Sequence, residues 1–144
     1  MKTYRILILF GLILYVDSFF LTGVKDASAA ANAKGIYGYD CASITLLSPW
    51  GSDGLKMFRE EPVNFLSVLF SGWINPVFLV TVVVLLIRPN SGLAGVLRIV
   101  LLIMFIAPWI VFYRVHLHPR GGYFLWTAAM LLVMFSSRLD KNAV

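Results

Sequence analysis

The stretch from Val63 to Ile87, VNFLSVLFSGWINPVFLVTVVVLLI, is 25 residues long and contains no charged side chain. A helix rises 1.5 Å per residue, so about 20 apolar residues cross a hydrocarbon layer about 30 Å thick. The stretch therefore predicts a transmembrane helix. Its second half is almost entirely Val, Leu and Ile, which suits contact with lipid, whereas its first half contains polar side chains.

These polar side chains share one face of the predicted helix. At 100° per residue they fall within about 80° of the helical wheel. They are Asn64, Ser67, Ser71 and Asn75. Because lipid cannot satisfy an amide, this face is expected to turn toward other helices or a wet cavity, with Gly72 allowing close approach and Pro76 favouring a kink. The polar groups serve either as interhelical hydrogen bonds or as a ligand or ion site.

The composition of the whole chain agrees with a membrane protein. Of the 144 residues, 60% are hydrophobic and 13% are charged, and the mean hydropathy is +0.85. Soluble domains are roughly 45–50% apolar. We expect a single membrane domain, residues 1–144, of the all-α class. The net charge of +5 has no basic run that would suggest nucleic acid.

The N-terminal apolar segment, residues 6–24, admits two interpretations. It is long enough for a first span, and Lys2 and Arg5 precede it. It also has the basic start of a signal peptide, with a small-residue cleavage motif at Ala27-Ser28-Ala29. Asp17 and the charged pair that follows the apolar segment favour a retained helix. The chain then has four transmembrane helices, or three if residues 1–29 are removed.

The other segments follow from the same signals. Residues 25–62 are expected to form a hydrophilic extracytoplasmic segment. Within it, the IYGYDCASITLLSPW stretch suits a short strand or the membrane surface. Asp53 is expected to cap a short helix, Gly54–Glu61. Arg88-Pro89 and a tight turn separate the long helix from a second one at 93–113, and the last span covers 121–137. Pro62 suits the first turn of the long helix.

Orientation rests on the first helix. With the N-terminus inside, six basic residues fall on each side of the membrane, so loop charge does not decide. Lys2 and Arg5 resist translocation, which places both termini in the cytoplasm of a bacterial inner or plasma membrane. The lipid bilayer is then the main partner.

Two ionisable residues within spans are candidate functional groups, because a charge at a helix centre costs about 2.5–3.5 kcal/mol. Asp17 is expected near the membrane midplane, as a proton or cation site or as a buried residue of the bundle. Arg98 lies close enough to its helix end to snorkel to the headgroups.

A basic loop follows the helix at 93–113. It contains Arg114, His116, His118 and Arg120. Two histidines without further ligands do not make a zinc site, so contact with anionic headgroups or an acidic partner is the better interpretation. Cys41 is the single cysteine and is expected to be a free, outward-facing thiol. No cofactor or metal is expected.

No hydrolase, phosphate-binding or metalloprotease motif occurs in the chain. The favoured hypothesis is a non-enzymatic membrane protein that acts through helix–helix contacts, as an accessory, scaffold or immunity-type subunit bound to a protein partner or to itself. The alternative is a small oligomeric transporter or channel subunit that uses Asp17 and the polar face of the long helix.

Overall fold

The computed structural model describes residues 3–26, 35–51 and 53–141 of the chain, and most of these residues are helical. The helices are α1 (Thr3–Phe20), α2 (Gly38–Leu47), α3 (Gly54–Glu60), α4 (Pro62–Ile87), α5 (Gly92–Met104), α6 (Ala107–Val115) and α7 (Gly121–Lys141), with a 3-10 turn, η1, at Ser48–Trp50. The strands are β1 (Thr22–Asp26), β2 (Ile36–Tyr37) and β3 (Leu117–Pro119).

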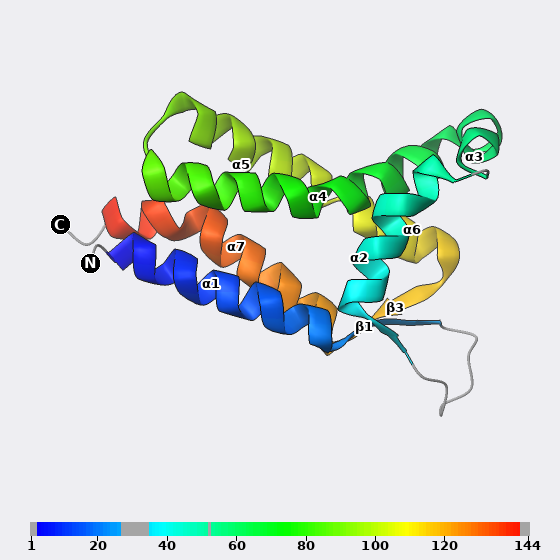
Figure 1. Ribbon diagram of the computed structural model, residues 1–144, viewed down its shortest axis with the longest axis horizontal. Helices are drawn as coiled ribbons and strands as arrows, with labels where there is room; N and C mark the ends of the chain where they lie inside the picture. The colour runs from blue at the N-terminus through cyan, green and yellow to red at the C-terminus, as the bar shows by residue number, and fades with distance from the viewer. Residues whose placement is uncertain (1–2, 27–34, 52, 142–144) are drawn as a thin grey trace.

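Two groups of helices make up the molecule (Figure 1). The helices α1 and α7 run antiparallel, side by side along their length, and α4 and α5 lie alongside this pair. The helices α2, α3 and α6 gather with the strands at the end opposite the start of α1. Buried side chains from α1, α4, α5 and α7 meet in one core, in which Ile8, Phe78, Leu101 and Met130 are fully buried. This core fixes the bundle that carries the site.

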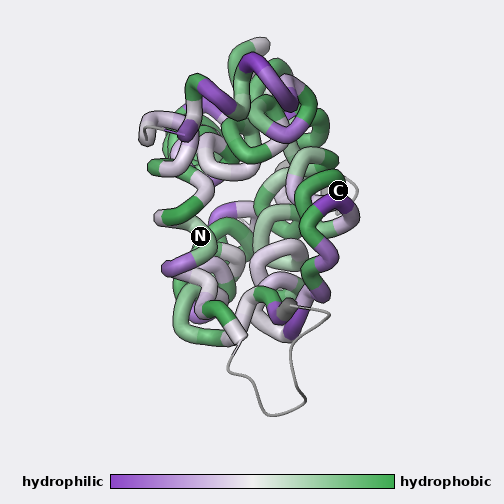
Figure 2. Tube along the Cα trace, turned by 90° about the vertical axis from the view of Figure 1, so that its right-hand side faces the viewer, coloured by the Kyte–Doolittle hydropathy of each residue, from purple (hydrophilic) through white to green (hydrophobic). Residues whose placement is uncertain are grey.

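Three helical segments are long and apolar enough to cross a membrane: α1, α4, and Gly92–Val115, which comprises α5 and α6. A shorter apolar helix, Gly121–Ser136, makes up most of α7. The view from the sheet end (Figure 2) shows many hydrophobic residues along the trace, with hydrophilic stretches at the top, where α3 lies, and also in the lower part of the view. Three of the predicted spans are therefore helical segments whose length and hydropathy would allow them to cross a membrane, and a fourth span stays a prediction.

The first helix ends earlier than the sequence indicated. It ends at Phe20, and Thr22–Asp26 form a strand where residues 22–24 were expected to be helical. Thr22 and Val24 are β-branched and flank a glycine, which lowers their helix preference. Hydrogen bonds to β2 and β3 then pair the backbone N–H and C=O groups of this strand. The cleavage motif at Ala27–Ala29 and Lys2 lie outside the described residues.

The strands form a small antiparallel sheet in the order β2-β1-β3, which corrects the expectation of an all-α fold. In β1, Val24 is aligned with Ile36 of β2 and with Pro119 of β3. The amide of Arg120 donates to the carbonyl of Gly23 at 2.8 Å and extends the pairing. The basic loop expected before the last span is thus a strand in part, and the IYGYDCASITLLSPW stretch is mainly helix α2 rather than strand.

The helix expected at 93–113 is divided. It comprises α5 and α6, which are separated at Phe105 and Ile106. Pro108 has no N–H to donate to the carbonyl of Met104, four residues earlier, which explains an interruption at this point. The turn after Ile87 is as short as expected, and the Ser91 hydroxyl caps α5 by accepting from the amide of Ala94 at 3.2 Å.

The predictions for the short helix before α4, and for the prolines of α4, are confirmed only in part. The short helix after residue 53 is present as α3, and Pro62 lies in the first turn of α4, as predicted. Asp53 precedes α3 but makes no side-chain capping bond. Pro76 lies inside α4, which runs uninterrupted from Pro62 to Ile87.

At Gly72 the backbone of α4 lies directly against the backbone of α2. A Cβ at this position would lie 2.5 Å from the carbonyl oxygen of Thr45 and 2.7 Å from the Cα of Leu46. Both of these are backbone atoms of α2, which a side-chain rotation cannot move. The α2–α4 contact therefore requires glycine at this position.

We predict that Gly72→Ala destabilises the fold by about 1–3 kcal/mol, because the added methyl group pushes α2 away from α4. Thermal unfolding in detergent, followed by circular dichroism, measures the effect. Gly95→Ala is the matched control, since nothing lies within 4 Å of a Cβ built there. A Gly72→Ala variant that unfolds at the wild-type temperature would contradict the required close contact.

Candidate functional site

Asn75 joins three helices through its side-chain carbonyl. The hydroxyl of Tyr15, on α1, donates to Asn75 Oδ1 at 3.1 Å, and Nε1 of Trp126, on α7, donates to the same oxygen at 2.9 Å. Asn75 itself lies in the middle of α4. The polar group that lipid could not satisfy is thus satisfied by the two neighbouring helices.

The serines of the same face are buried but serve their own helix. The hydroxyl of Ser67 donates to the carbonyl of Val63, and that of Ser71 donates to the carbonyl of Ser67, both at 2.7 Å. Asn64, at the start of α4, is half-buried and bonds to Glu61. The structure therefore turns Ser67, Ser71 and Asn75 toward protein, while their role as a binding or ion site stays a prediction.

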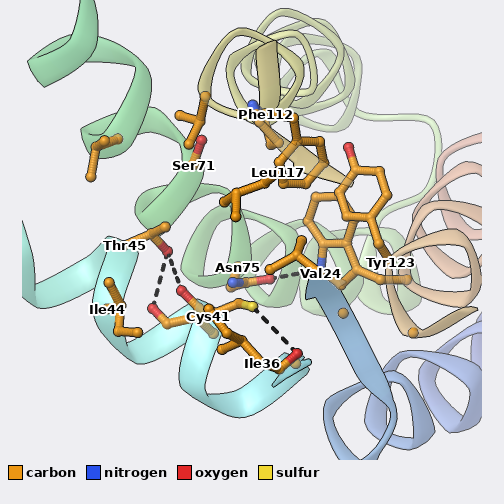
Figure 3. A pocket seen from close by; sticks show the side chains of 18 of the residues that line it. Val24, Ile36, Cys41, Ile44, Thr45, Ser71, Asn75, Phe112, Leu117 and Tyr123 are labelled. Carbon is orange, nitrogen blue, oxygen red and sulfur yellow. Dashed lines mark hydrogen bonds between the residues drawn. The ribbon is translucent and has the colours of Figure 1, made fainter. Parts of the chain in front are cut away.

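A pocket of about 300 Å³ opens beside Asn75, at the end of the bundle that carries the sheet (Figure 3). Residues of α1, the three strands, α2, α4, α6 and α7 line it. The apolar and aromatic lining side chains include Val24, Ile36, Val68, Val111, Phe112, Leu117, Tyr123 and Trp126. Within the described part of the chain, no lining residue carries a charge.

Three of the hydroxyl groups that line the pocket are already paired with backbone carbonyls. Ser18 donates to the carbonyl of Tyr15 at 2.6 Å, and Thr45 donates to the carbonyl of Cys41 at 2.9 Å. Ser71 is paired within α4. The interior is therefore mainly hydrocarbon and aromatic rings, with very few polar groups free to orient a bound molecule, as is typical of sites for apolar ligands.

The aromatic side of the pocket is built from α6 and α7. The rings of Tyr123 and Trp126 stack with their centroids 5.3 Å apart, and Phe112 meets Tyr123 edge-on at 4.7 Å. Such pairs hold one another in fixed orientations. The rings thus provide a rigid wall next to Asn75.

Cys41 is half-buried and lines the pocket from α2. Burial, together with a smaller contribution from the neighbouring Asp40 carboxylate, raises the pKa of its thiol to about 11. The thiolate is the reactive form of cysteine, so this thiol is inert at neutral pH. The expected free thiol is present, but the structure encloses it more than an outward-facing position implied.

The two ionisable candidates do not join the pocket. Asp17 is exposed in the last turn of α1, only three residues before the helix ends at Phe20. The expectation that it lies near the middle of a span does not fit a helix that ends at this point. Arg98 is half-buried on α5 and is not a lining residue.

The basic residues expected in one loop are spread over three kinds of structure. Arg114 lies at the end of α6, His118 lies in β3, and Arg120 follows that strand; all three are exposed. His116 ends α6 with a positive φ of 53°, a conformation that histidine adopts more readily than most residues. Among the described residues, no group of three or more His, Cys, Asp or Glu side chains is placed to hold a metal ion.

Sequence reasoning missed Tyr15, Trp126 and the aromatic wall. Tyr15 and Trp126 each carry one polar atom in the middle of an apolar segment, where a partner is required. That signal was present in the sequence. Their common partner, Asn75, is 60 and 51 residues away, and only the fold brings the three together.

No protein-family model, curated protein or solved structure matches this chain. Its function is therefore inferred from the geometry of the pocket and of the bundle around it.

We predict that Asn75→Leu destabilises the protein by about 1–3 kcal/mol, because leucine leaves the Tyr15 hydroxyl and Trp126 Nε1 buried without an acceptor. Unfolding in a denaturing detergent measures the loss. Val83→Leu, on the exposed outer side of the same helix, is the control and should change stability little. Equal stability of the two variants would show that the three-helix hydrogen bonds do not hold the bundle together.

We also predict that Cys41 reacts slowly with a maleimide at pH 7 and that its rate rises about tenfold per pH unit up to pH 10. With a pKa of about 11, the thiolate fraction is still increasing at that pH. An unperturbed thiol, with a pKa of about 8.5, would instead level off near pH 9. Stopped-flow labelling of the purified protein distinguishes the two profiles, and a plateau near pH 9 would contradict the burial of Cys41.

Proposed function

We propose that this chain is a non-enzymatic integral membrane protein that binds an apolar small molecule taken from the bilayer. The observation that carries the proposal is the pocket beside Asn75, which has about 300 Å³ of space and a largely hydrocarbon and aromatic lining. Ligand pockets in proteins usually fall in the range of about 300–1,000 Å³. A small ring, or part of a longer chain, fits such a space.

The proposed membrane arrangement has four spans: α1, α4, the α5–α6 segment and α7. Three of these are long and apolar enough, and α7 adds a shorter apolar helix antiparallel to α1. The start of α1 and the end of α7 lie at the same end of the molecule (Figure 1), which supports placing both termini on one side, the cytoplasm. The sheet, α2 and α3 then lie on the outer side, together with the pocket.

Retention of the first helix is part of this proposal. Tyr15 contributes one of the two hydrogen bonds to Asn75, and Ile8 is fully buried in the core. Removal of α1 as a signal peptide would expose the facing side of α7. Both observations support a helix that stays in the mature protein.

A role as an accessory or scaffold subunit is the second proposal. The α5–α6 segment presents aliphatic side chains on its outer side, where Val96, Ile99, Ile103 and Ile106 are each more than half exposed. Such a face suits lipid and also suits a helix of a partner or a second copy. The transporter alternative draws less support, because Asp17 is exposed and is not a lining residue of the pocket, and the serines are paired within α4.

The proposed function can be tested with a bulky substitution that fills the pocket. Val68, on α4, lines the pocket, and we predict that Val68→Phe displaces a bound apolar molecule. Val80→Phe adds the same bulk to the exposed side of the same helix and is the matched control. Native mass spectrometry of protein released from detergent should show a retained ligand in the wild type and in Val80→Phe, and much less in Val68→Phe.

Two outcomes would contradict this function. One is a wild-type protein that retains no apolar molecule and takes up none when it is offered. The other is equal retention by Val68→Phe and Val80→Phe. Thermal unfolding of both variants shows whether a loss of ligand reflects a loss of fold.

A further inference from the structure

The orientation of the Asn75 side-chain amide follows from its partners. The indole N–H of Trp126 can only donate, so the atom of Asn75 that faces it must be the carbonyl oxygen. The Tyr15 hydroxyl donates to that same oxygen. Two helices therefore fix the amide, and its NH₂ group must point the other way.

The Nδ2 group faces the pocket. In Figure 3 the amide nitrogen lies on the side away from the bond to Trp126, toward Cys41. It makes no hydrogen bond within the described residues, and it is not sealed in the interior as the unpaired hydroxyl of Tyr123 is. A fixed, unused hydrogen-bond donor thus projects into an apolar space.

The surroundings define what this donor can bind. Within the described part of the chain, no cationic side chain lines the pocket, so a carboxylate or phosphate headgroup would be buried without charge compensation. A neutral oxygen acceptor carries no such penalty. The neighbouring rings of Tyr123 and Trp126 and the aliphatic side chains from the strands suit an apolar body around that oxygen.

We propose that the Asn75 NH₂ group donates a hydrogen bond to the carbonyl oxygen of a neutral, lipid-soluble molecule held in the pocket. The inference rests on the proposed binding function and specifies its ligand class. Two sources of this chemistry occur in bilayers: the ring carbonyl of a quinone-type molecule and the ester carbonyl of a neutral glycerolipid. Asn75 is a specificity-determining residue in either case.

The experiment compares ligands that differ in the carbonyl group. Decylbenzoquinone is paired with decylbenzene, which has the same decyl chain on a six-carbon ring without carbonyl oxygens, and a short-chain diacylglycerol tests the ester. Each is titrated against the full-length protein in detergent at pH 8, and the bound fraction is measured by native mass spectrometry. The wild type should bind at least one carbonyl compound about tenfold more tightly than decylbenzene.

The key variant is Asn75→Asp. One aspartate oxygen still accepts from Tyr15 and Trp126, and the other, once ionised, is an acceptor in place of the NH₂ donor. Because burial raises the pKa of a carboxyl group and its neutral form can still donate, this variant is also titrated at pH 9 and pH 10, where the ionised form is favoured. We expect the preference for the carbonyl ligand to fall about tenfold, with decylbenzene binding nearly unchanged. Thr81→Ala is the control, since this hydroxyl on α4 is paired with the carbonyl of Val77 and does not line the pocket, and it should retain the preference.

The outcomes separate the inference from the function on which it rests. Asn75-dependent binding of the quinone or of the diacylglycerol supports the inference and identifies the source. Binding of all three compounds with no effect of Asn75→Asp overturns the inference but leaves the pocket as an apolar binding site. If the wild type binds none of them, the proposed function itself fails.

Discussion

The hydrogen bonds to Asn75 Oδ1 are the constraint on which the arrangement of the bundle depends. In hydrocarbon an amide must find its partners inside the protein, and here the partners come from α1 and α7, the pair of helices that faces α4. Packing of aliphatic side chains tolerates small shifts between helices, whereas two donors that converge on one oxygen allow one alignment. The aromatic wall and the pocket next to it take their positions from this alignment.

Glycine and proline govern the other parts of the fold. Gly72 lets the backbone of α2 rest on α4, which brings Cys41 and Thr45 to the pocket. Pro108 separates α5 from α6, so that α6 and its Phe112 pack beside Tyr123 instead of continuing the line of α5. These residues position the walls of the pocket without contributing polar chemistry to it.

Much of the helical frame could be predicted from the sequence, because long uncharged stretches and short turns are local signals. The Val63–Ile87 helix, the turn after it and the inward side of Ser67, Ser71 and Asn75 follow from length and periodicity. The sheet could not be predicted in this way, since β2 has two residues and its pairing with β1 depends on contacts outside the strand itself. The end of α1 at Phe20, three residues after Asp17, could not be predicted for a related reason: the strand that follows it pairs with β3, more than 90 residues later in the chain.

The central position of β1 in the sheet has a mechanical consequence. This strand continues α1 almost directly, and it is hydrogen-bonded on one side to the strand that leads into α2 and on the other to the strand between α6 and α7. Val24, Ile36 and Leu117, one from each strand, all line the pocket. A sliding movement of α1 along its axis would pull on all three strands at once. The width of the pocket is therefore coupled to the axial position of the first helix.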